Sequence, residues 1–378
     1  MATPIRKRNP RCAAPKSQPL FNLRPRDGLV GRPDEDAWAL RVFLRVKTLS
    51  MCRRHVDYKQ EGDDLILGRD VLDTRRIGSL EVSGVGLGCN NFGRRLDSEA
   101  TSAVVDDALD EGINFFDTAD VYGGTKSEEF LGRALGQRRE EVVIATKFGA
   151  KVDEQRMGAR PEYVRQAAEE SLRRLRTDRI DLYQLHRPDP EVPIEDTLGA
   201  LDELVRAGKV REIGCSNFSA AQLRAAEEAA RGGGARFVSV QNEYSLLHRE
   251  AERDVLPECE RLGIAFIPYF PLASGLLTGK YRKGQPAPEG SRLQSRRGDS
   301  LLTDRNLAVV ERLIEFSESR GHTILELAIS WLLERPAVAS VIAGATSPEQ
   351  VRSNVAAAGW RLTEEELAEI DAIVSRAE

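Results

Sequence analysis

Residues 180–216 read IDLYQLHRPDPEVPIEDTLGALDELVRAGKVREIGCS, and this stretch contains one complete strand–helix–strand unit. The short apolar runs Ile180–Leu185 and Glu212–Ser216 are typical of buried strands. Between them, apolar side chains recur with helical spacing at Ile194, Leu198, Leu201, Leu204 and Val205. Gly208 then stands where the end of a helix favours a residue with positive φ. The stretch therefore predicts two strands joined by a helix.

The same alternation of strand and helix patterns continues along most of the chain. Eight strands are predicted, at Gly84–Leu87, Asn114–Asp117, Val142–Lys147, Ile180–Leu185, Glu212–Ser216, Phe237–Gln241, Ala265–Phe270 and Ser340–Ala343. Thr323 with Glu326, and Thr363 with Glu366, form the capping-box pattern of a helix start. Repeated strand–helix units of this number predict a (β/α)8 TIM barrel of the α/β class, with the helix after Thr363 as an extra C-terminal helix.

The glycine-rich run SGVGLG at residues 83–88 favours a rival fold, the doubly wound sheet that binds dinucleotides. Its fingerprint GxGxxG, started at Gly84, requires glycine at position 89, where this chain has Cys89. A helical pattern also begins only near Ser98, too late for a glycine-rich turn that opens a helix. The barrel is therefore the preferred fold.

Composition excludes several classes of protein. The chain has 378 residues, of which 41% are hydrophobic, and a net charge of −5, so a barrel-sized core is possible and nucleic acid is not an expected partner. Because no run of about 18 apolar residues occurs, we predict no membrane span. The five cysteines are widely spaced and the chain has four histidines, which argues against a zinc site and for a reduced, cytoplasmic setting.

The beginning of the chain has a different character. Residues 1–60 hold 14 Lys/Arg and 5 Asp/Glu. Three interpretations compete: a disordered tail, an organelle transit peptide, or sequence translated upstream of a start at Met51. Arginine outnumbers lysine throughout the chain, which favours the tail or the misplaced start. We therefore divide the chain into a basic extension, residues 1–70, expected to be disordered, and a barrel domain, residues 71–378.

Polar side chains stand where the predicted strands end, which is the end of a barrel that carries the chemistry. Asp117, Lys147 and His186 close the second, third and fourth strands, and Tyr122 lies in the loop after the second. A buried charge needs partners, so we expect these four side chains to converge. Each alone has an ordinary explanation, as a turn former, a solvated rim lysine, a core histidine or a loop tyrosine.

Together the four residue types suit the reduction of a carbonyl group. The developing alkoxide needs a proton donor, and a free tyrosine with a pKa of about 10 is a weak acid at neutral pH. We predict that Lys147 lowers the pKa of Tyr122, that Asp117 balances the charge of Lys147, and that His186 polarises the substrate oxygen. An isomerase that uses the Lys147–Asp117 pair is an alternative.

The ordered motifs between residues 72 and 374 resemble those of the aldo-keto reductase superfamily. They are GLGCNNFG at 86–93, DTADVYG at 117–123, Lys147, HRPD at 186–189 and GCSNF at 214–218. The resemblance implies an enzyme that reduces aldehydes or ketones with NAD(P)H. It also implies a catalytic tetrad of Asp117, Tyr122, Lys147 and His186, in which Tyr122 is the proton donor.

The resemblance further implies a cofactor site along the later strand ends. In the family, positions matching Ser216, Asn217 and Gln241 hold the nicotinamide amide, and the position of Tyr269 stacks on its ring. The remaining cofactor residues expected are Cys89, Asn90, Phe270, Pro271, Leu272, Ser274, Gly344, Thr346, Gln350 and Asn354. From the residues themselves, Ser347 and Gln350 form a capping-box pattern, and the free amides of that helix start suit a phosphate.

The choice between NADPH and NADH depends on two features with opposite implications. Many NADPH-dependent members of the family have Lys or Arg near residues 344–346, whereas this chain has GAT. However, Lys280 and Arg292 match cationic positions that clamp the cofactor phosphates in the branch of potassium-channel β subunits and bacterial aryl-alcohol reductase-like proteins. We expect NADPH, a small carbonyl substrate and a monomer. A nucleotide-binding regulatory module is the alternative, although His186 favours turnover because those β subunits often have Asn there.

Overall fold

The computed structural model describes residues 72–294 and 296–375 of the chain. Eight parallel strands form one sheet in the order β10-β3-β4-β5-β6-β7-β8-β9. Their bounds are Val85–Gly88 (β3), Phe115–Asp117 (β4), Val143–Phe148 (β5), Ile180–Leu185 (β6), Val210–Ser216 (β7), Phe237–Glu243 (β8), Ala265–Tyr269 (β9) and Val341–Gly344 (β10). Each coincides with a predicted strand to within a few residues, so the prediction of a (β/α)8 barrel is confirmed.

The barrel closes between its last two strands. β10 pairs with β3 over four positions, from Val341 with Val85 to Gly344 with Gly88. On the other side, Phe266 of β9 forms a bridge to Val338, just before β10. Phe266 N donates to Ala337 O at 2.7 Å, and Ala339 N donates to Phe266 O at 3.0 Å. These bonds satisfy the backbone at the seam, so the parallel sheet has no open edge there.

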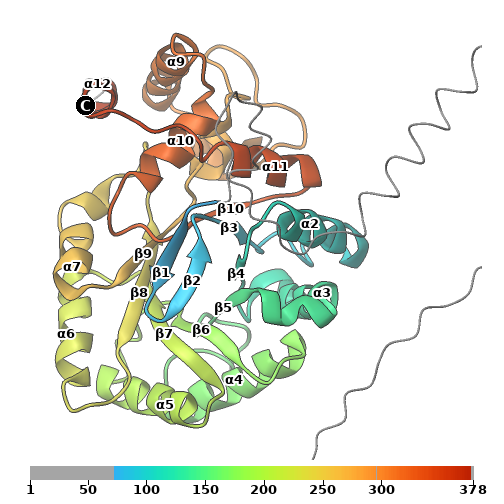
Figure 1. The fold of residues 1–378 in the computed structure, drawn as a ribbon, viewed down its shortest axis with the longest axis vertical. Coiled ribbons are helices and arrows are strands. Elements are labelled where there is room, and N and C mark those ends of the chain that lie inside the picture. Colours follow the sequence, from blue (N-terminus) through green and yellow to red (C-terminus); the bar gives the residue numbers. More distant parts are fainter. Residues whose placement is uncertain (1–71, 295, 376–378) are drawn as a thin grey trace, which may run out of the picture. The chain divides into compact units, whose positions relative to one another are not determined.

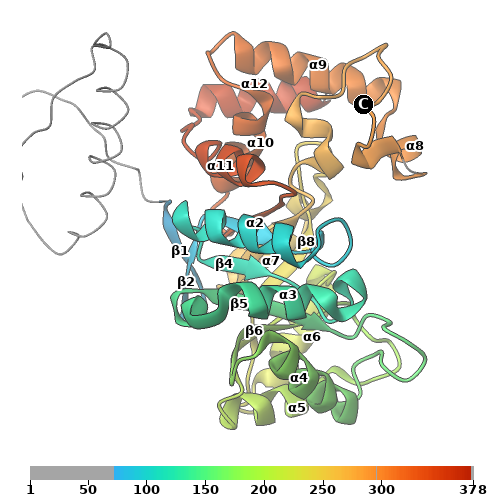
Figure 2. The ribbon, with the colours of Figure 1, turned by 90° about the vertical axis from the view of Figure 1, so that its right-hand side faces the viewer.

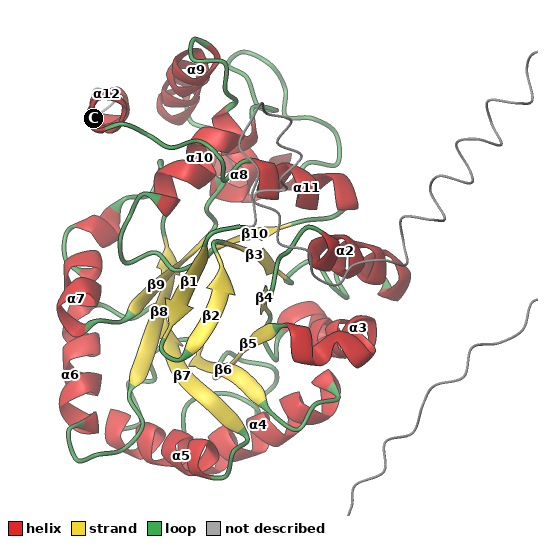
Figure 3. Ribbon diagram, in the orientation of Figure 1, coloured by secondary structure: helices red, strands yellow, loops and turns green. Residues whose placement is uncertain are grey.

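Helices surround the strands on the outside (Figure 3). The helices that follow the strands are α2 (Ser98–Asp110), α3 (Lys126–Leu135), α4 (Pro161–Leu175), α5 (Ile194–Arg206), α6 (Ala220–Ala230), α7 (Val255–Leu262), α10 (Ile324–Leu333) and α11 (Pro348–Ala356). Two more, α8 (Arg296–Leu301) and α9 (Asp304–Glu318), lie in the long connection from β9 to α10. Gly208 has a φ of +71° just after α5, as predicted for a helix end.

The short elements complete this order. They are the 3-10 helices η1 (Tyr122–Thr125), η2 (Gly136–Glu141), η3 (Glu250–Glu252), η4 (Ala273–Thr278) and η5 (Arg292–Gln294). The capping box at Thr323 and Glu326 is present at the start of α10. Thr363 N donates to Glu366 at 2.8 Å, and Glu366 N donates back to Thr363 Oγ1 at 3.2 Å, which confirms the second box.

The predicted extra C-terminal helix is α12 (Glu364–Ser375), which lies beside α9 away from the barrel strands (Figure 2). Its apolar face includes Ile370 and Ile373, both buried. Arg320 at the end of α9 forms ion pairs with Glu366 and Glu369 of α12, at 3.3 and 2.6 Å. The helix is therefore held by an apolar contact with a polar rim.

A β-hairpin that the sequence analysis did not predict covers the N-terminal end of the barrel (Figure 1). Its strands are β1 (Thr74–Ile77) and β2 (Leu80–Ser83), joined by a two-residue turn in which Gly78 has a φ of +56°. Apolar side chains of the hairpin complete the core inside the barrel, which comprises Ile77, Leu80, Val82, Phe115, Val143, Ala145, Leu182, Ala265, Ile267, Ala339 and Ile342. The hairpin thus closes the end opposite to the strand carboxyl ends.

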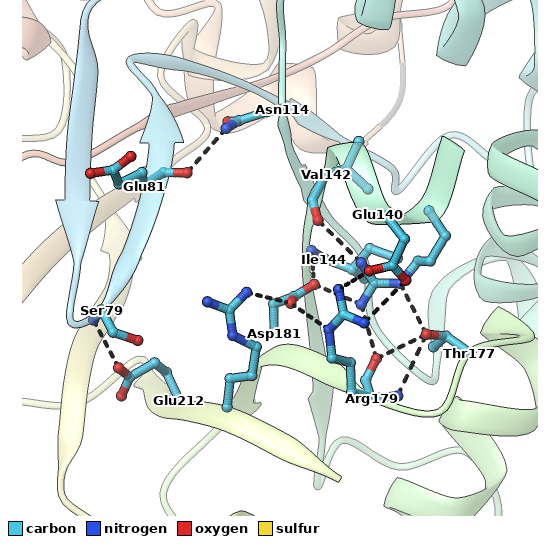
Figure 4. Close-up of polar contacts among 12 residues, drawn as sticks. Ser79, Glu81, Asn114, Glu140, Val142, Ile144, Thr177, Arg179, Asp181 and Glu212 are labelled. Carbon is cyan, nitrogen blue, oxygen red and sulfur yellow. Dashed lines mark hydrogen bonds and ion pairs between the residues drawn. The ribbon is translucent and has the colours of Figure 1, made fainter. Parts of the chain in front are cut away.

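Polar contacts at the same end hold the hairpin and strands together (Figure 4). Ser79 N donates to Glu212 at 2.8 Å. Asp181, fully buried on β6, accepts from Arg139 at 2.7 Å, from Arg211 at 3.0 Å and from Ile144 N at 3.0 Å. A buried carboxylate of this kind is stable because its charge and lone pairs are satisfied by several donors.

The predicted basic extension, residues 1–70, and its boundary lie outside the described residues, so both stay predictions. Among residues 72–294 and 296–375, no helix is long and apolar enough to cross a membrane.

Candidate active site

The four residues predicted to converge do so at the carboxyl ends of β4, β5 and β6. Lys147 Nζ donates to Asp117 Oδ2 at 2.6 Å and to Thr118 O at 2.9 Å. It also lies 3.4 Å from Tyr122 Oη, within hydrogen-bonding distance. The ring of His186 meets the ring of Tyr122 edge to face, with centroids 5.8 Å apart. The structure therefore brings four groups into one cluster, the carboxyl of Asp117, the ammonium of Lys147, the phenol of Tyr122 and the imidazole of His186.

Asp117 is held from the other side by two glutamines. Gln241 Nε2 donates to Asp117 Oδ1 at 2.8 Å, and Gln184 Nε2 donates to the same oxygen at 3.3 Å. Gln184 was not predicted as a site residue, although a glutamine inside the apolar run of β6 was a usable signal. Gln241 was predicted to hold a cofactor amide, and in this structure its amide nitrogen is used by Asp117.

The loop that carries Tyr122 is fixed by a close backbone contact. Gly123 has a φ of +60°, and a Cβ at this position would lie 2.3 Å from Phe92 O. Gly93 meets the same turn, since its Cβ would lie 2.5 Å from the Cβ of Lys126. Only glycine fits such an approach, so the loops after β3 and β4 are locked together beside Tyr122.

Lys147 acts on the pKa of Tyr122 in the predicted direction, but the net shift is upward. Burial raises this pKa above 10.0, the charge of Lys147 opposes the rise, and Asp117 adds to it. The sequence revealed the cation but not the desolvation that outweighs it. Burial also opposes the charge on Lys147, but Asp117 and Tyr122 outweigh it and raise the pKa of Lys147. At neutral pH Tyr122 is therefore a phenol and Lys147 an ammonium.

His186 is a neutral imidazole in this setting. Burial, followed by the charges of Lys147 and Arg187, lowers its pKa to about 3. The Nδ1 atom is buried and has no hydrogen-bond partner among the described residues. Its backbone is held firmly, because His186 N donates to Phe148 O at 2.8 Å and His186 O accepts from Asn217 Nδ2 at 3.0 Å. A neutral ring can donate one hydrogen bond to a substrate oxygen without carrying charge.

The residues predicted to bind a nicotinamide amide contact one another. Ser216 Oγ donates to Gln241 O at 2.7 Å, and Asn217 Nδ2 donates to Ser216 Oγ at 3.0 Å. Tyr269 Oη donates to Asn217 Oδ1 at 2.8 Å. Asn217 has a φ of +62°, and its amide bonds His186 O after β6 and Tyr269 of β9. The predicted group is therefore assembled, with its amides engaged by the protein itself.

One cavity of about 1250 Å³ contains the whole candidate site. All the predicted site residues except Lys147 line it. Lys147 is fully buried, with its ammonium on Asp117 and Tyr122. The lining also includes Arg94, Arg95, Arg187 and Glu243, which were not predicted. Their adjacency in sequence to Asn90, His186 and Gln241 was the signal that could have identified them.

The far end of the cavity differs in detail from the prediction. Gln350 does not form the predicted capping box with Ser347, because its Oε1 instead accepts from Thr346 N at 2.9 Å. The Glu349 carboxylate bonds its own backbone amide and the Ser347 hydroxyl, which lowers its pKa. The predicted free amides are therefore occupied at the start of α11. A phosphate bound there would have to replace these two side chains.

A contact across the cavity links the segment after β9 to two other strand ends. Arg292 Nη2 donates to Asn91 Oδ1 at 3.1 Å. Asn91 Nδ2 donates in turn to Ala345 O at 3.0 Å, beside β10. The predicted Lys280 lines the same cavity, with its Nζ 5.3 Å from the ring centre of Tyr281. Both predicted cations therefore line one cavity, and the contact made by Arg292 lies beside β10.

Most of this chain is similar to known proteins. The model of the aldo/keto reductase family matches residues 84–375. Probable aldo-keto reductase 1 of Glycine max is 36% identical over 299 residues, which cover 77% of this chain and 85% of that protein. The uncharacterized oxidoreductase YrpG of Bacillus subtilis (strain 168) is 36% identical over 300 residues, which cover 76% and 90%.

A solved structure shows the same fold. The glycerol dehydrogenase AKR11B4 from Gluconobacter oxydans superposes with a TM-score of 0.71 at 34% sequence identity, and the match covers 81% of this chain and 96% of that one.

Proposed function

Because this chain belongs to the aldo/keto reductase family of oxidoreductases, we propose that it reduces aldehydes or ketones with NADPH and that Tyr122 donates the proton. The observation that carries the proposal is the position of Lys147 Nζ, 2.6 Å from Asp117 and 3.4 Å from the Tyr122 hydroxyl beside a large cavity. A phenol next to a buried ammonium suits proton donation to an alkoxide, because the ammonium stabilises the phenolate that remains.

Each residue of the cluster has a part in the proton transfer. When bound, the reduced nicotinamide supplies the hydride to the carbonyl carbon. The Tyr122 hydroxyl donates its proton to the carbonyl oxygen, and the neutral His186 ring donates a hydrogen bond to the same oxygen. Lys147 offsets the negative charge left on Tyr122. Asp117 keeps Lys147 charged and in place, with the help of Gln184 and Gln241.

The residues present fit a nicotinamide dinucleotide. Ser274 Oγ and Asn90 Oδ1 are buried, lack a hydrogen-bond partner among the described residues, and belong to side chains that line the cavity. Buried polar atoms are rarely left unpaired, which supports a polar ligand there. Asn217, Ser216 and Tyr269 would hold the nicotinamide end, whereas Lys280 and Arg292 would meet the phosphates.

We further propose that the enzyme prefers NADPH over NADH. Lys280 and Arg292 are two cations that line the same cavity as Thr346 and Gln350. A 2′-phosphate carries more charge than the hydroxyl it replaces, so paired cations would favour NADPH.

Purified protein tested with NADPH and a panel of aldehydes, ketones and quinones gives the direct check. We expect NADPH oxidation that depends on the carbonyl compound, with alcohol formed in equal amount. Absence of turnover with every compound, in protein that binds NADPH, would contradict the proposed activity and favour a regulatory nucleotide-binding role.

A further inference from the structure

Three arginines line the cavity that contains Tyr122 and His186. Arg94 and Arg95 follow Gly93, which packs against the turn next to Tyr122, and Arg187 directly follows His186. The charge of Arg187 acts on His186, since it helps to lower the pKa of that ring, and Arg94 and Arg95 lie in the loop that packs against the turn next to Tyr122.

The backbone beneath these arginines is rigid. The amides of Arg94 and Arg95 both donate to Asn91 O, at 3.2 and 2.8 Å, and Leu96 N donates to the same oxygen at 3.0 Å. Arg187 stands between the anchored His186 and Asp189, whose carboxylate accepts from Ala159 N at 2.9 Å and from Glu191 N at 3.0 Å. The fold therefore fixes the backbone from which the three side chains extend.

None of the three arginines is neutralised by the part of the chain that the structure describes. No hydrogen bond or ion pair of their guanidinium groups occurs there. All three arginines are exposed to solvent, where a ligand can reach them.

The carboxylates nearby do not cancel this charge. The acidic residues that line the cavity are Asp117, which Lys147 already pairs, Glu243 at the end of β8, and Glu289 in the segment after η4. A side pocket of about 500 Å³ opens beside His186 and is lined by Arg187, Pro188, Asp189, Pro190, Asn217 and Gln222. Both oxygens of Asp189 are used by backbone amides, as described above.

We propose that the carbonyl substrate carries an anionic group, a carboxylate or a phosphate, which Arg187 binds together with Arg94 or Arg95. The inference rests on the proposed reductase function and specifies its substrate class. A planar guanidinium matches the two oxygens of either anion and binds them through parallel hydrogen bonds. The carbonyl end of such a substrate would then lie at Tyr122 and His186.

The test compares matched substrates that differ in charge, with NADPH in excess. Succinic semialdehyde against butanal tests a carboxylate, and glyceraldehyde 3-phosphate against glyceraldehyde tests a phosphate. We expect kcat/KM of the anionic compound to exceed that of its neutral partner by roughly tenfold or more in at least one pair. The favoured pair identifies the anion. A ratio near or below one in both pairs overturns the proposal.

Variants of the three arginines test whether these residues cause the preference for the anionic substrate. Arg187→Gln, and separately Arg94→Gln with Arg95→Gln, should reduce the anionic-to-neutral ratio by about tenfold, mainly through KM. Arg173→Gln, which removes an exposed arginine on α4 away from the cavity, should leave the ratio unchanged. Raised ionic strength should lower the wild-type ratio, because salt screens exposed charges. A ratio unaffected in every cavity variant contradicts the proposal.

A binding measurement separates this inference from the proposed activity. If no aldehyde is reduced, the reductase function fails, and the anion site is then tested by calorimetric titration of benzoate, phenylphosphonate and benzamide. Tighter binding of either anion than of benzamide, lost in Arg187→Gln, supports the site. Equal binding of all three overturns it.

Discussion

Asp117 and Lys147 form an ion pair of 2.6 Å inside the barrel, where their side chains are 3% and 0% exposed. Taking two charges out of water is costly, and the cost is offset here by hydrogen bonds to both oxygens of Asp117. The hydroxyl of Tyr122 lies 3.4 Å from the same ammonium. The ion pair should therefore matter for the stability of the barrel, and it also places an ammonium beside the proposed proton donor.

Replacement of Lys147 by Met should separate these two roles. The variant leaves Asp117 buried without its cation, so we expect a loss of about 3–5 kcal/mol in the free energy of unfolding, together with a large loss of kcat. The double variant Lys147→Met/Asp117→Asn should regain part of the stability and none of the activity. Denaturant unfolding and steady-state kinetics measure both, and a double variant no more stable than Lys147→Met would contradict the ion-pair account.

The buried carboxylate at the opposite end of the barrel should affect stability without affecting catalysis. Asp181→Asn removes the charge that balances Arg139 and Arg211, so we expect a loss of about 3–5 kcal/mol in the free energy of unfolding and unchanged kcat/KM. The matched control is Glu140→Gln, which removes an exposed partner of Arg179 and should change little. A fall in kcat/KM of folded Asp181→Asn would show that the two ends are coupled.

Asp120 should make the protein less stable as the pH rises toward neutrality. Burial, and then Glu128, raise its pKa from 3.8 to about 7. Between these values the folded state binds more protons than the unfolded state, so stability falls as the pH rises from about 4 to 7, by up to about 4 kcal/mol. Asp120→Asn should remove this part of the slope in thermal unfolding, whereas the exposed-site control Asp178→Asn should keep it. The same slope in wild type and Asp120→Asn would refute the assignment.

The strands of the barrel were predictable because each is a short apolar run next to a turn, and that signal is local. The hairpin of β1 and β2 was missed although it has Gly78-Ser79 between two short strands, because those strands carry charged residues such as Arg75 and Glu81. Its burial comes from barrel residues far along the chain, including Ala265 and Ala339. The sequence of the hairpin itself does not indicate that it packs against these distant residues.

The same contrast between local sequence signals and long-range contacts applies to the candidate site. Asp117, Tyr122, Lys147 and His186 were predictable because each stands at or just after a strand end. A glutamine inside the apolar run of β6 was visible as a signal, but its partner was not, since the bond of Gln184 to Asp117 joins residues 67 positions apart. The sign of the Tyr122 pKa shift was also beyond a sequence argument, because it depends on how far burial outweighs Lys147. Charge is visible in a sequence, whereas desolvation is a property of the folded state.

The preference for NADPH should depend on the two cavity cations Lys280 and Arg292. We expect NADPH to bind more tightly than NADH, and Lys280→Gln or Arg292→Gln to weaken NADPH by about tenfold while weakening NADH less. Quenching of intrinsic fluorescence measures both affinities. Lys283→Gln, in the same segment but not lining the cavity, is the control. Equal or reversed affinities in the wild type would remove the role assigned to Lys280 and Arg292.

The proton donor is tested most directly by Tyr122→Phe in a single-turnover reaction, in which enzyme with bound NADPH is mixed with an aldehyde and nicotinamide oxidation is followed. The variant keeps the ring that packs against His186 and loses only the hydroxyl near Lys147. We predict that the rate constant falls by roughly 10²–10⁴-fold while the Kd for NADPH is unchanged. A rate near that of the wild type would contradict the account.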